Sequence, residues 1–486
     1  MKQKILLVLA VFISSICFGQ ISYETGNEFT LNDQEETEPQ FVLLDSYNAY
    51  LMTITQVDGM LSSHKITIRK FDQKNQLIDT YTQEFQKIDA GTLYNYLGFK
   101  EVNNNQVVVF AESYSGKEKK KDIYKYVFDK TTAKFTSSLV ASFAIESAMK
   151  SGTTELEISD NGRYIGIINK KDPSKKEPVQ DNVVMMDAAT LSVLWNKEVT
   201  LEEKVYDRGF TITNSGKAIL LRAAKGLKLS NYITVVSQNA QEDKQFEEAV
   251  MLHDPKAISI GQADYLIDFN YDAKGSRKGD YEKFMLYDIG QGKTIKNNII
   301  TEFNTLKDIN EIKITKIFLQ NNEIHVFTEA KVQAGTKQVK VNAFSSMTMD
   351  EPYYKFGPSH LIIMSFEGEV KEIKSIRTGD NCQANFYHSY GLLNINGRYF
   401  INISSGMAQA PEIYEQSLVP FDKSVISLLT NIMGVPGAED LQKGGGSKYV
   451  NQLFGYVKDA KKVILCRGNA YNKMSLISVM GFPTNK

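Results

Sequence analysis

The residues whose type and spacing could do chemistry are two glutamates, Glu155 and Glu157, which alternate along one predicted strand. Alternate residues of a strand point to the same side, so the two carboxylates would share a face. Glycoside hydrolases use paired carboxylates, roughly 5 Å or 6.5–9.5 Å apart. Solvated strand faces produce such pairs as well, and we therefore predict no catalytic residue from the sequence alone.

Other candidate motifs lack a required residue. GQGKT, at 290–294, imitates part of a phosphate-binding loop, but Tyr287 stands where that motif needs glycine. DFNYDAKG, at 268–275, alternates polar groups as calcium loops do, but Ala273 replaces the glycine of the sharp turn. The five histidines are scattered. The sequence predicts no metal site and no cofactor.

The chain begins with the layout of a secretory signal peptide. Two lysines precede the apolar run 5–16, and small residues follow up to Gly19. We predict a leader at 1–19 and a mature chain at 20–486. The expected compartment is the periplasm, with a secreted protein or a lipid anchor on Cys17 as the alternatives. No later segment reaches the roughly 18 apolar residues of a membrane span.

Composition limits the ligands and the sources of stability. The formal net charge is −1, so no basic excess favours nucleic acid. Two lysine-rich stretches, 117–121 and 170–176, are interleaved with acids and are predicted to be solvated loops. Only Cys382 and Cys466 follow the leader. They form either one disulfide or two buried thiols, which spacing alone does not decide.

The elements that position these residues repeat along the chain. NGRYIGII, at 161–168, is echoed by NGRYFINI, at 396–403. Each is a turn that leads into a short apolar strand, and the same step recurs with first strand residues Tyr50, Val107, Tyr164, Ala218, Tyr265, Ile324, Tyr399 and Val463. A hairpin with a polar or glycine turn follows in each unit. We predict eight units of four antiparallel strands, with the quoted turn between the first and second strands.

Four-stranded units repeated in this way predict an all-β fold, an eight-bladed β-propeller, with seven blades as the alternative. The last unit lacks one strand. The segment 21–31, ISYETGNEFTL, precedes the first unit and is predicted to complete the last blade. The turns SDNGRY and TNSGKA resemble the turn-strand step of WD-repeat and TolB-like propellers. This resemblance covers one step per repeat and implies the same architecture.

Three insertions interrupt the repeat, near 331–358, 404–414 and 429–450. Strand order places them on one face as long loops, which often hold binding residues. Tyr353, Tyr354, Phe356 and Tyr414 are the predicted partner-binding residues, because aromatic side chains are enriched in interface hot spots. The aromatic residues of the first insertion could instead pack that insertion onto its own blade.

The resulting expectation is an exported binding scaffold that is not an enzyme and that docks an envelope protein. The chain resembles envelope propellers that dock on outer-membrane machinery, including the periplasmic plug of the type IX secretion translocon. That resemblance implies a partner in an outer-membrane complex. The alternative is a hydrolase or lyase that acts on carbohydrate or peptide in the channel of the propeller.

Overall fold

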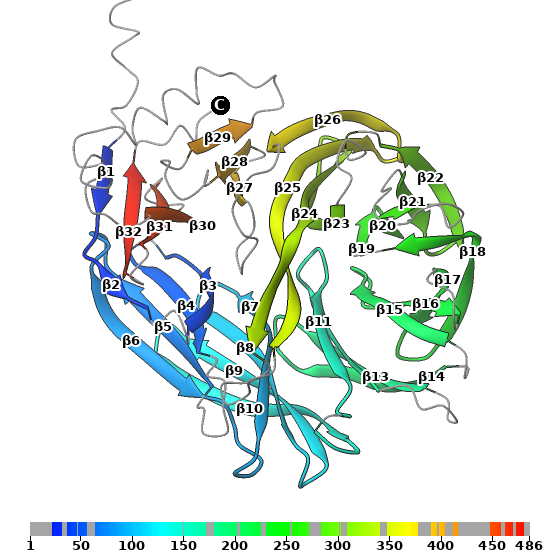
Figure 1. The fold of residues 1–486 in the computed structure, drawn as a ribbon, viewed down its shortest axis with the longest axis horizontal. Helices are drawn as coiled ribbons and strands as arrows, with labels where there is room; N and C mark the ends of the chain where they lie inside the picture. Colours follow the sequence, from blue (N-terminus) through cyan, green and yellow to red (C-terminus); the bar gives the residue numbers. More distant parts are fainter. Residues whose placement is uncertain are drawn as a thin grey trace, which may run out of the picture. The chain divides into compact units, whose positions relative to one another are not determined.

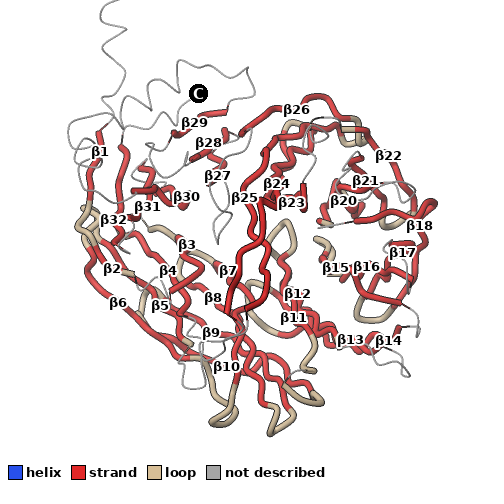
Figure 2. The backbone as a smooth tube through the Cα atoms, in the orientation of Figure 1, coloured by secondary structure: helices blue, strands red, loops and turns tan. Residues whose placement is uncertain are grey.

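A computed structural model shows how the chain folds. Every element assigned in the part of the chain that it describes is a β-strand (Figure 2). It describes residues 22–31, 36–45, 47–55, 64–148, 150–171, 179–201, 205–224, 230–252, 255–271, 283–300, 302, 309–340, 348–377, 390–395, 398–403, 412–416, 448–457, 462–469 and 473–480. The predicted leader at 1–19, Cys382, and most of the insertions at 404–414 and 429–450 lie outside these ranges. None of the described segments is a helix of the length and apolarity that crossing a bilayer requires.

The chain forms two compact units, which are described separately. The first, here named the clasp unit, comprises Met1–Val57, Lys65–Gln83 and Phe386–Lys486. The second, here named the central unit, comprises Asp58–His64 and Glu84–Asn385. All residues of the candidate site lie in the central unit.

The central unit is a series of four-stranded antiparallel meanders (Figure 1). The first two sheets contain β7 (Leu93–Val102), β8 (Gln106–Ser115), β9 (Lys120–Asp129) and β10 (Lys134–Ala144), then β11 (Thr153–Ile158), β12 (Tyr164–Lys170), β13 (Val179–Asp187) and β14 (Val193–Leu201). The next meander contains β15 (Val205–Ile212), β16 (Ala218–Ala224), β17 (Ser230–Val236) and β18 (Gln241–Leu252). It joins, through β18 and β20, the meander of β19 (Lys256–Ile260), β20 (Ala263–Tyr271), β21 (Lys283–Asp288) and β22 (Lys293–Ile299).

The last sheet of the central unit contains β23 (Ile309–Gln320), β24 (Glu323–Lys340), β25 (Thr348–Ser365) and β26 (Val370–Arg377). Strands β24 and β25 are unusually long. Their distal parts, 333–340 and 348–354, pair with each other and form a two-stranded ribbon beyond β23 and β26. The insertion at 331–358 is therefore a strand extension, and its prediction as a loop was wrong.

The second strands β8 and β12 are mostly buried, for a reason visible in the sequence. Strand β8 carries the continuous apolar run Val107, Val108, Val109 and Phe110, all fully buried. A strand covered on both faces needs such a run, whereas a strand with one solvated face alternates. The fourth strands β10 and β22 are largely exposed. Burial thus falls from the second strand to the fourth within a sheet.

The clasp unit contains three sheets. One is formed by β3 (Glu36–Phe41), β4 (Ala49–Thr55), β5 (Lys65–Phe71) and β6 (Leu77–Glu84). A second contains β27 (Tyr390–Ile395), β28 (Arg398–Ile403) and β29 (Glu412–Gln416). The third contains β30 (Lys448–Val457), β31 (Lys462–Asn469) and β32 (Lys473–Met480), to which the N-terminal strands β1 (Ser22–Thr25) and β2 (Phe29–Thr30) are added.

The N-terminal segment completes the last sheet, as predicted. Strand β1 pairs antiparallel with β32, from Ser22 opposite Met480 to Thr25 opposite Ile477. An apolar cluster joins this segment to the first and last sheets through Phe29, Leu31, Ala49, Leu51, Phe71, Ile464, Met474 and Leu476. The all-β class and the four-stranded sheets agree with a β-propeller. The count of eight blades remains a prediction.

A buried asparagine in the turn after β5 forms hydrogen bonds with both β1 and β32. The side chain of Asn75 donates a hydrogen bond to the carbonyl oxygen of Glu24 (3.0 Å) and accepts one from the hydroxyl of Ser478 (2.8 Å). Asn75 is fully buried, and it lies in the turn between β5 and β6. The backbone N–H of Gly26 donates to the carbonyl of Leu476. A Cβ atom on Gly26 would lie 2.0 Å from the backbone oxygen of Asn75.

We expect Gly26→Ala to lower the free energy of unfolding by about 1–3 kcal/mol, because the added methyl group forces the turn of Asn75 away from β1. Chemical denaturation measures this change. The control is Gly91→Ala, whose added Cβ would meet only an Asp89 carboxylate oxygen at 3.7 Å. Equal stability of the two variants would contradict a close-packed closure at Gly26.

Candidate functional site

The first strands of five successive meanders converge in the central unit. Strand β11 contacts β7 and β15, and β15 contacts β19. All five first strands, β7, β11, β15, β19 and β23, contribute residues to one cavity of about 350 Å³. We name it the lysine cavity and define it by Lys100, Glu157, Asp160, Thr211, Lys256 and Lys316. Its size falls within the usual range of small-molecule sites.

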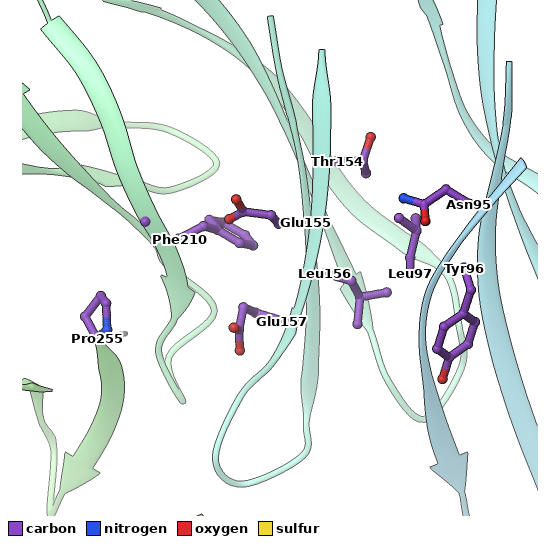
Figure 3. Close-up of a pocket in the computed structure, with 10 residues that line it drawn as sticks. Asn95, Tyr96, Leu97, Thr154, Glu155, Leu156, Glu157, Phe210 and Pro255 are labelled. Atoms are coloured by element: carbon purple, nitrogen blue, oxygen red, sulfur yellow. The ribbon is translucent and has the colours of Figure 1, made fainter. Parts of the chain in front are cut away.

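A second cavity of about 390 Å³ adjoins β11 (Figure 3). We name it the glutamate cavity and define it by Asn95, Leu97, Thr154, Glu155, Glu157 and Phe210. Figure 3 shows Glu155 and Glu157 on the same side of β11, toward Phe210, with Thr154 and Leu156 on the opposite side. The predicted alternation is confirmed. Glu157 lines both cavities.

Each of the two glutamates forms an ion pair with a lysine. Glu155 Oε1 lies 2.6 Å from Lys170 Nζ, on the neighbouring strand β12. Glu157 Oε1 lies 3.2 Å from Lys256 Nζ, on β19. The second pair connects the first strands of two meanders, the one before and the one after the meander that begins with β15. The Glu157 carboxylate therefore lines both cavities with a lysine ammonium group beside it.

Asp160 is the second carboxylate of the lysine cavity, and its environment differs from that of Glu157. It lies in the turn after β11, where water reaches its side chain. The surrounding strands still remove part of its hydration. This burial raises the pKa of the Asp160 carboxyl, while the Lys316 ammonium and a hydrogen bond with the Asn214 side chain oppose the rise. A raised pKa suits a carboxylic acid that donates a proton.

Two lysines approach this site from strands far apart in the sequence. Burial lowers the pKa of the Lys100 ammonium on β7; Glu101 raises it in part and Lys316 on β23 lowers it further. Lys100 also lies close to the turn after β11. A Cβ atom on Gly162 would be 2.8 Å from Lys100 Nζ, and the φ of Gly162 is +68°. The positive φ favours glycine there, whereas the Lys100 ammonium, at the end of a flexible side chain, could move away from an added Cβ.

The repeated turns hold the first strands of neighbouring sheets in register. The N–H of Asn161 donates to Asn214 Oδ1 (2.8 Å), in the equivalent turn of the next sheet. That turn continues the series, because the hydroxyl of Ser215 donates to Asp264 Oδ2 (2.7 Å). The polar turn residues therefore bond from one repeat to the next, which explains why the sequence repeats them.

A buried lysine corrects one prediction. Lys121, in a stretch predicted to be a solvated loop, lies at the start of β9 and is fully buried. Its ammonium lies 3.4 Å from a Glu112 carboxylate oxygen and donates to Thr154 Oγ1 and Asn169 Oδ1 in the next sheet. It joins the two sheets. Lys117 remains exposed, whereas residues 172–176 lie outside the described ranges.

The predicted partner-binding residues lie on two strands. Tyr353, Tyr354 and Phe356 lie on β25, where Tyr353 pairs with Gly335 and Phe356 with Lys331. Tyr414 lies on β29 of the clasp unit. Their role in partner binding stays a prediction.

Other motifs are placed as follows. The GQGKT stretch covers the turn between β21 and β22 and the first two residues of β22. Asp268 is buried on β20, and Ala273 lies outside the described ranges. Within those ranges no three His, Cys, Asp or Glu side chains are grouped to hold a metal ion.

Sequence reasoning missed four charged residues of the lysine cavity, namely Lys100, Asp160, Lys256 and Lys316. Of these four residues, Asp160 could have been found from the sequence, because it lies in the SDNGRY turn directly after the strand of the two glutamates. The lysines come from three other repeats, and no local pattern marks them.

Comparison with known proteins assigns no family to the chain. No protein-family model matches the chain, and no curated protein sequence matches it significantly. An acylaminoacyl peptidase from Pyrococcus horikoshii is similar in structure, with a TM-score of 0.39, 10% identity, and coverage of 89% of this chain and 57% of that one. The β-propeller domain of the Trilobed protease from Pyrococcus furiosus gives a TM-score of 0.40 and 11% identity over 79% of this chain and 95% of that one. This chain thus spans little more than half the length of the peptidase.

These comparisons correct the expectation that the protein is not an enzyme. The two structures are a peptidase and a domain of a protease. Enzymes therefore occur among the structural neighbours, and the fold gives no reason to exclude catalysis. Likenesses of this size assign no activity to this chain.

The raised pKa of Asp160 predicts a pH-dependent effect on stability. Above an unfolded pKa of about 3.9, the folded state holds a carboxylate that burial disfavours. We expect Asp160→Asn to match the wild type near pH 3 and to melt at a higher temperature at pH 7. The difference develops as the pH rises through the folded pKa of Asp160.

Asp187→Asn is the matched control of opposite sign. Hydrogen bonds from the Thr190 backbone, the Thr190 hydroxyl and the Ala189 backbone lower the pKa of Asp187, and Arg163 lowers it further. Its stabilising effect is present at neutral pH and is lost as the pH falls through its folded pKa. Thermal melts from pH 3 to 8 measure both variants. A shift of the same sign at pH 7 would contradict the assigned environments.

Proposed function

We propose that the protein is a hydrolase of β-propeller architecture that cleaves a carbohydrate in the lysine cavity. The observation that supports this function most strongly is the convergence of two unlike carboxylates in one cavity. Glu157 is paired with Lys256, whereas burial raises the pKa of Asp160. A carboxyl group with a raised pKa in the same cavity as an ion-paired carboxylate suits a general acid and a general base.

The proposed reaction adds one water molecule across a glycosidic bond. Asp160 gives its proton to the glycosidic oxygen as the bond from that oxygen to the anomeric carbon breaks. Glu157 takes a proton from water as the water oxygen bonds to the same carbon. The leaving sugar departs as an alcohol. Proton exchange with solvent then returns Asp160 to the acid and Glu157 to the carboxylate.

We expect Glu157→Gln and Asp160→Asn each to lower kcat about 10²- to 10⁴-fold, because each removes one proton-transfer group. Activity of the wild type should fall as the pH rises through the raised pKa of Asp160. Hydrolysis of a panel of oligosaccharides and aryl glycosides measures these effects. Glu118→Gln, which changes an exposed carboxylate outside both cavities, is the control. Wild-type rates in both site variants would contradict the proposed function.

The β24–β25 ribbon supports a second proposed role, the docking of an envelope protein. Residues 333–340 and 348–354 pair with each other and leave an outer edge on either side, as far as the described pairings extend. An exposed strand edge can accept a strand of a partner. The predicted leader supports export to the envelope. Docking to outer-membrane machinery there would be a second role of the protein beside hydrolysis.

Shortening the ribbon tests this second role. Val332 and Lys355 are paired across β24 and β25. A two-residue Asn-Gly turn can therefore replace 333–354. We expect affinity purification from solubilised envelope to recover a stoichiometric partner with the full chain and to lose it with the shortened chain, while hydrolysis persists. Recovery of the same partner by both proteins would contradict docking through the ribbon.

A further inference from the structure

The lysine cavity holds more positive charge than its acid–base chemistry requires. Lys100, Lys256 and Lys316 face two carboxylates, Glu157 and Asp160. The ion pair of Glu157 with Lys256 accounts for one charge of each sign. Two ammonium groups and Asp160 remain. When Asp160 carries its proton as the general acid, the two remaining lysines face no carboxylate other than the paired Glu157 among the residues that line the cavity.

Lys100 is half-buried in the wall of the cavity, whereas Lys316 is exposed to solvent. Neither forms a salt bridge or a hydrogen bond within the described residues, although Glu101 acts on Lys100 and Asp160 on Lys316 at longer range. The two ammonium groups act on each other from β7 and β23. Like charges brought together by the fold repel each other, and an anion between them would relieve this repulsion.

The strands themselves hold the two lysines near the proposed acid. Lys100 lies against the turn that contains Asp160 and Gly162, since a Cβ on Gly162 would nearly touch its ammonium. Lys316 acts directly on Asp160. A negatively charged group of a bound ligand would therefore lie next to the reacting bond.

We infer that Lys100 and Lys316 together bind an anionic group of the substrate, so that the substrate is an acidic carbohydrate whose sugar carries a carboxylate or a sulfate. This inference rests on the proposed function, because it identifies the class of sugar that the same cavity accepts. An ammonium group beside a carboxylate or sulfate makes charge-assisted hydrogen bonds, which are stronger than those to a neutral hydroxyl.

Calorimetric titration of the full chain tests the inference with three probes. These are tri-galacturonate, a sulfated trisaccharide and the neutral maltotriose. We expect at least one acidic probe to bind more tightly than maltotriose, and the preferred probe distinguishes carboxylate from sulfate. Lys100→Met and Lys316→Met should each weaken its binding about 10- to 100-fold. Lys134→Met removes one exposed lysine outside the cavity and is the charge-matched control.

The outcomes separate this inference from the proposed function. Equal affinity for acidic and neutral probes, or unchanged affinity in both folded lysine variants, overturns the inference even if Glu157→Gln and Asp160→Asn abolish hydrolysis. Circular dichroism melts show that the variants are folded. If no saccharide binds and none is hydrolysed, the proposed function fails together with the inference.

Discussion

The unpaired outer edges of the first strands are the constraint on which the site depends. Strands β7, β11, β15, β19 and β23 each pair with one neighbour in the described sheets. The other edge must be shielded, and the five strands shield it by converging in the central unit. This convergence brings side chains of five repeats to one cavity. In the clasp unit, β1 pairs with β32 and adds the strand that the last sheet lacks. Both arrangements cover unpaired strand edges, but only the convergence of the first strands forms a cavity for a ligand.

Most of the architecture could be predicted from the sequence, because its signals are local. Turn residues followed by apolar strands mark each hairpin, and the run at Val107 marks a strand buried on both faces. The missing last strand pointed to the N-terminal segment. The insertion at 331–358, which contains Pro352, was predicted as a loop because insertions into a repeat usually form loops. A two-stranded ribbon has free outer edges, so it tolerates a proline that a central strand would not.

The chemistry of the site was far less accessible. The side-by-side placement of Glu155 and Glu157 follows from the two-residue period of a strand, and the structure confirms it. Their importance depends on partners from distant repeats: Lys256 beside Glu157, and Lys316 beside Asp160. No spacing in one sequence encodes such neighbours. The burial of Lys121 shows the same limit, because its charge is matched by Glu112 on an adjacent strand and by polar groups of the next sheet.

A crystal structure of the Glu157→Gln protein with a bound oligosaccharide tests the central claim most directly. That claim is that the converging first strands form a catalytic cavity with Asp160 as the acid. The account predicts sugar density in the lysine cavity, with a glycosidic oxygen about 2.6–3.2 Å from an Asp160 carboxyl oxygen. Density for the sugar at another surface, with the lysine cavity left free at saturating ligand, would contradict it.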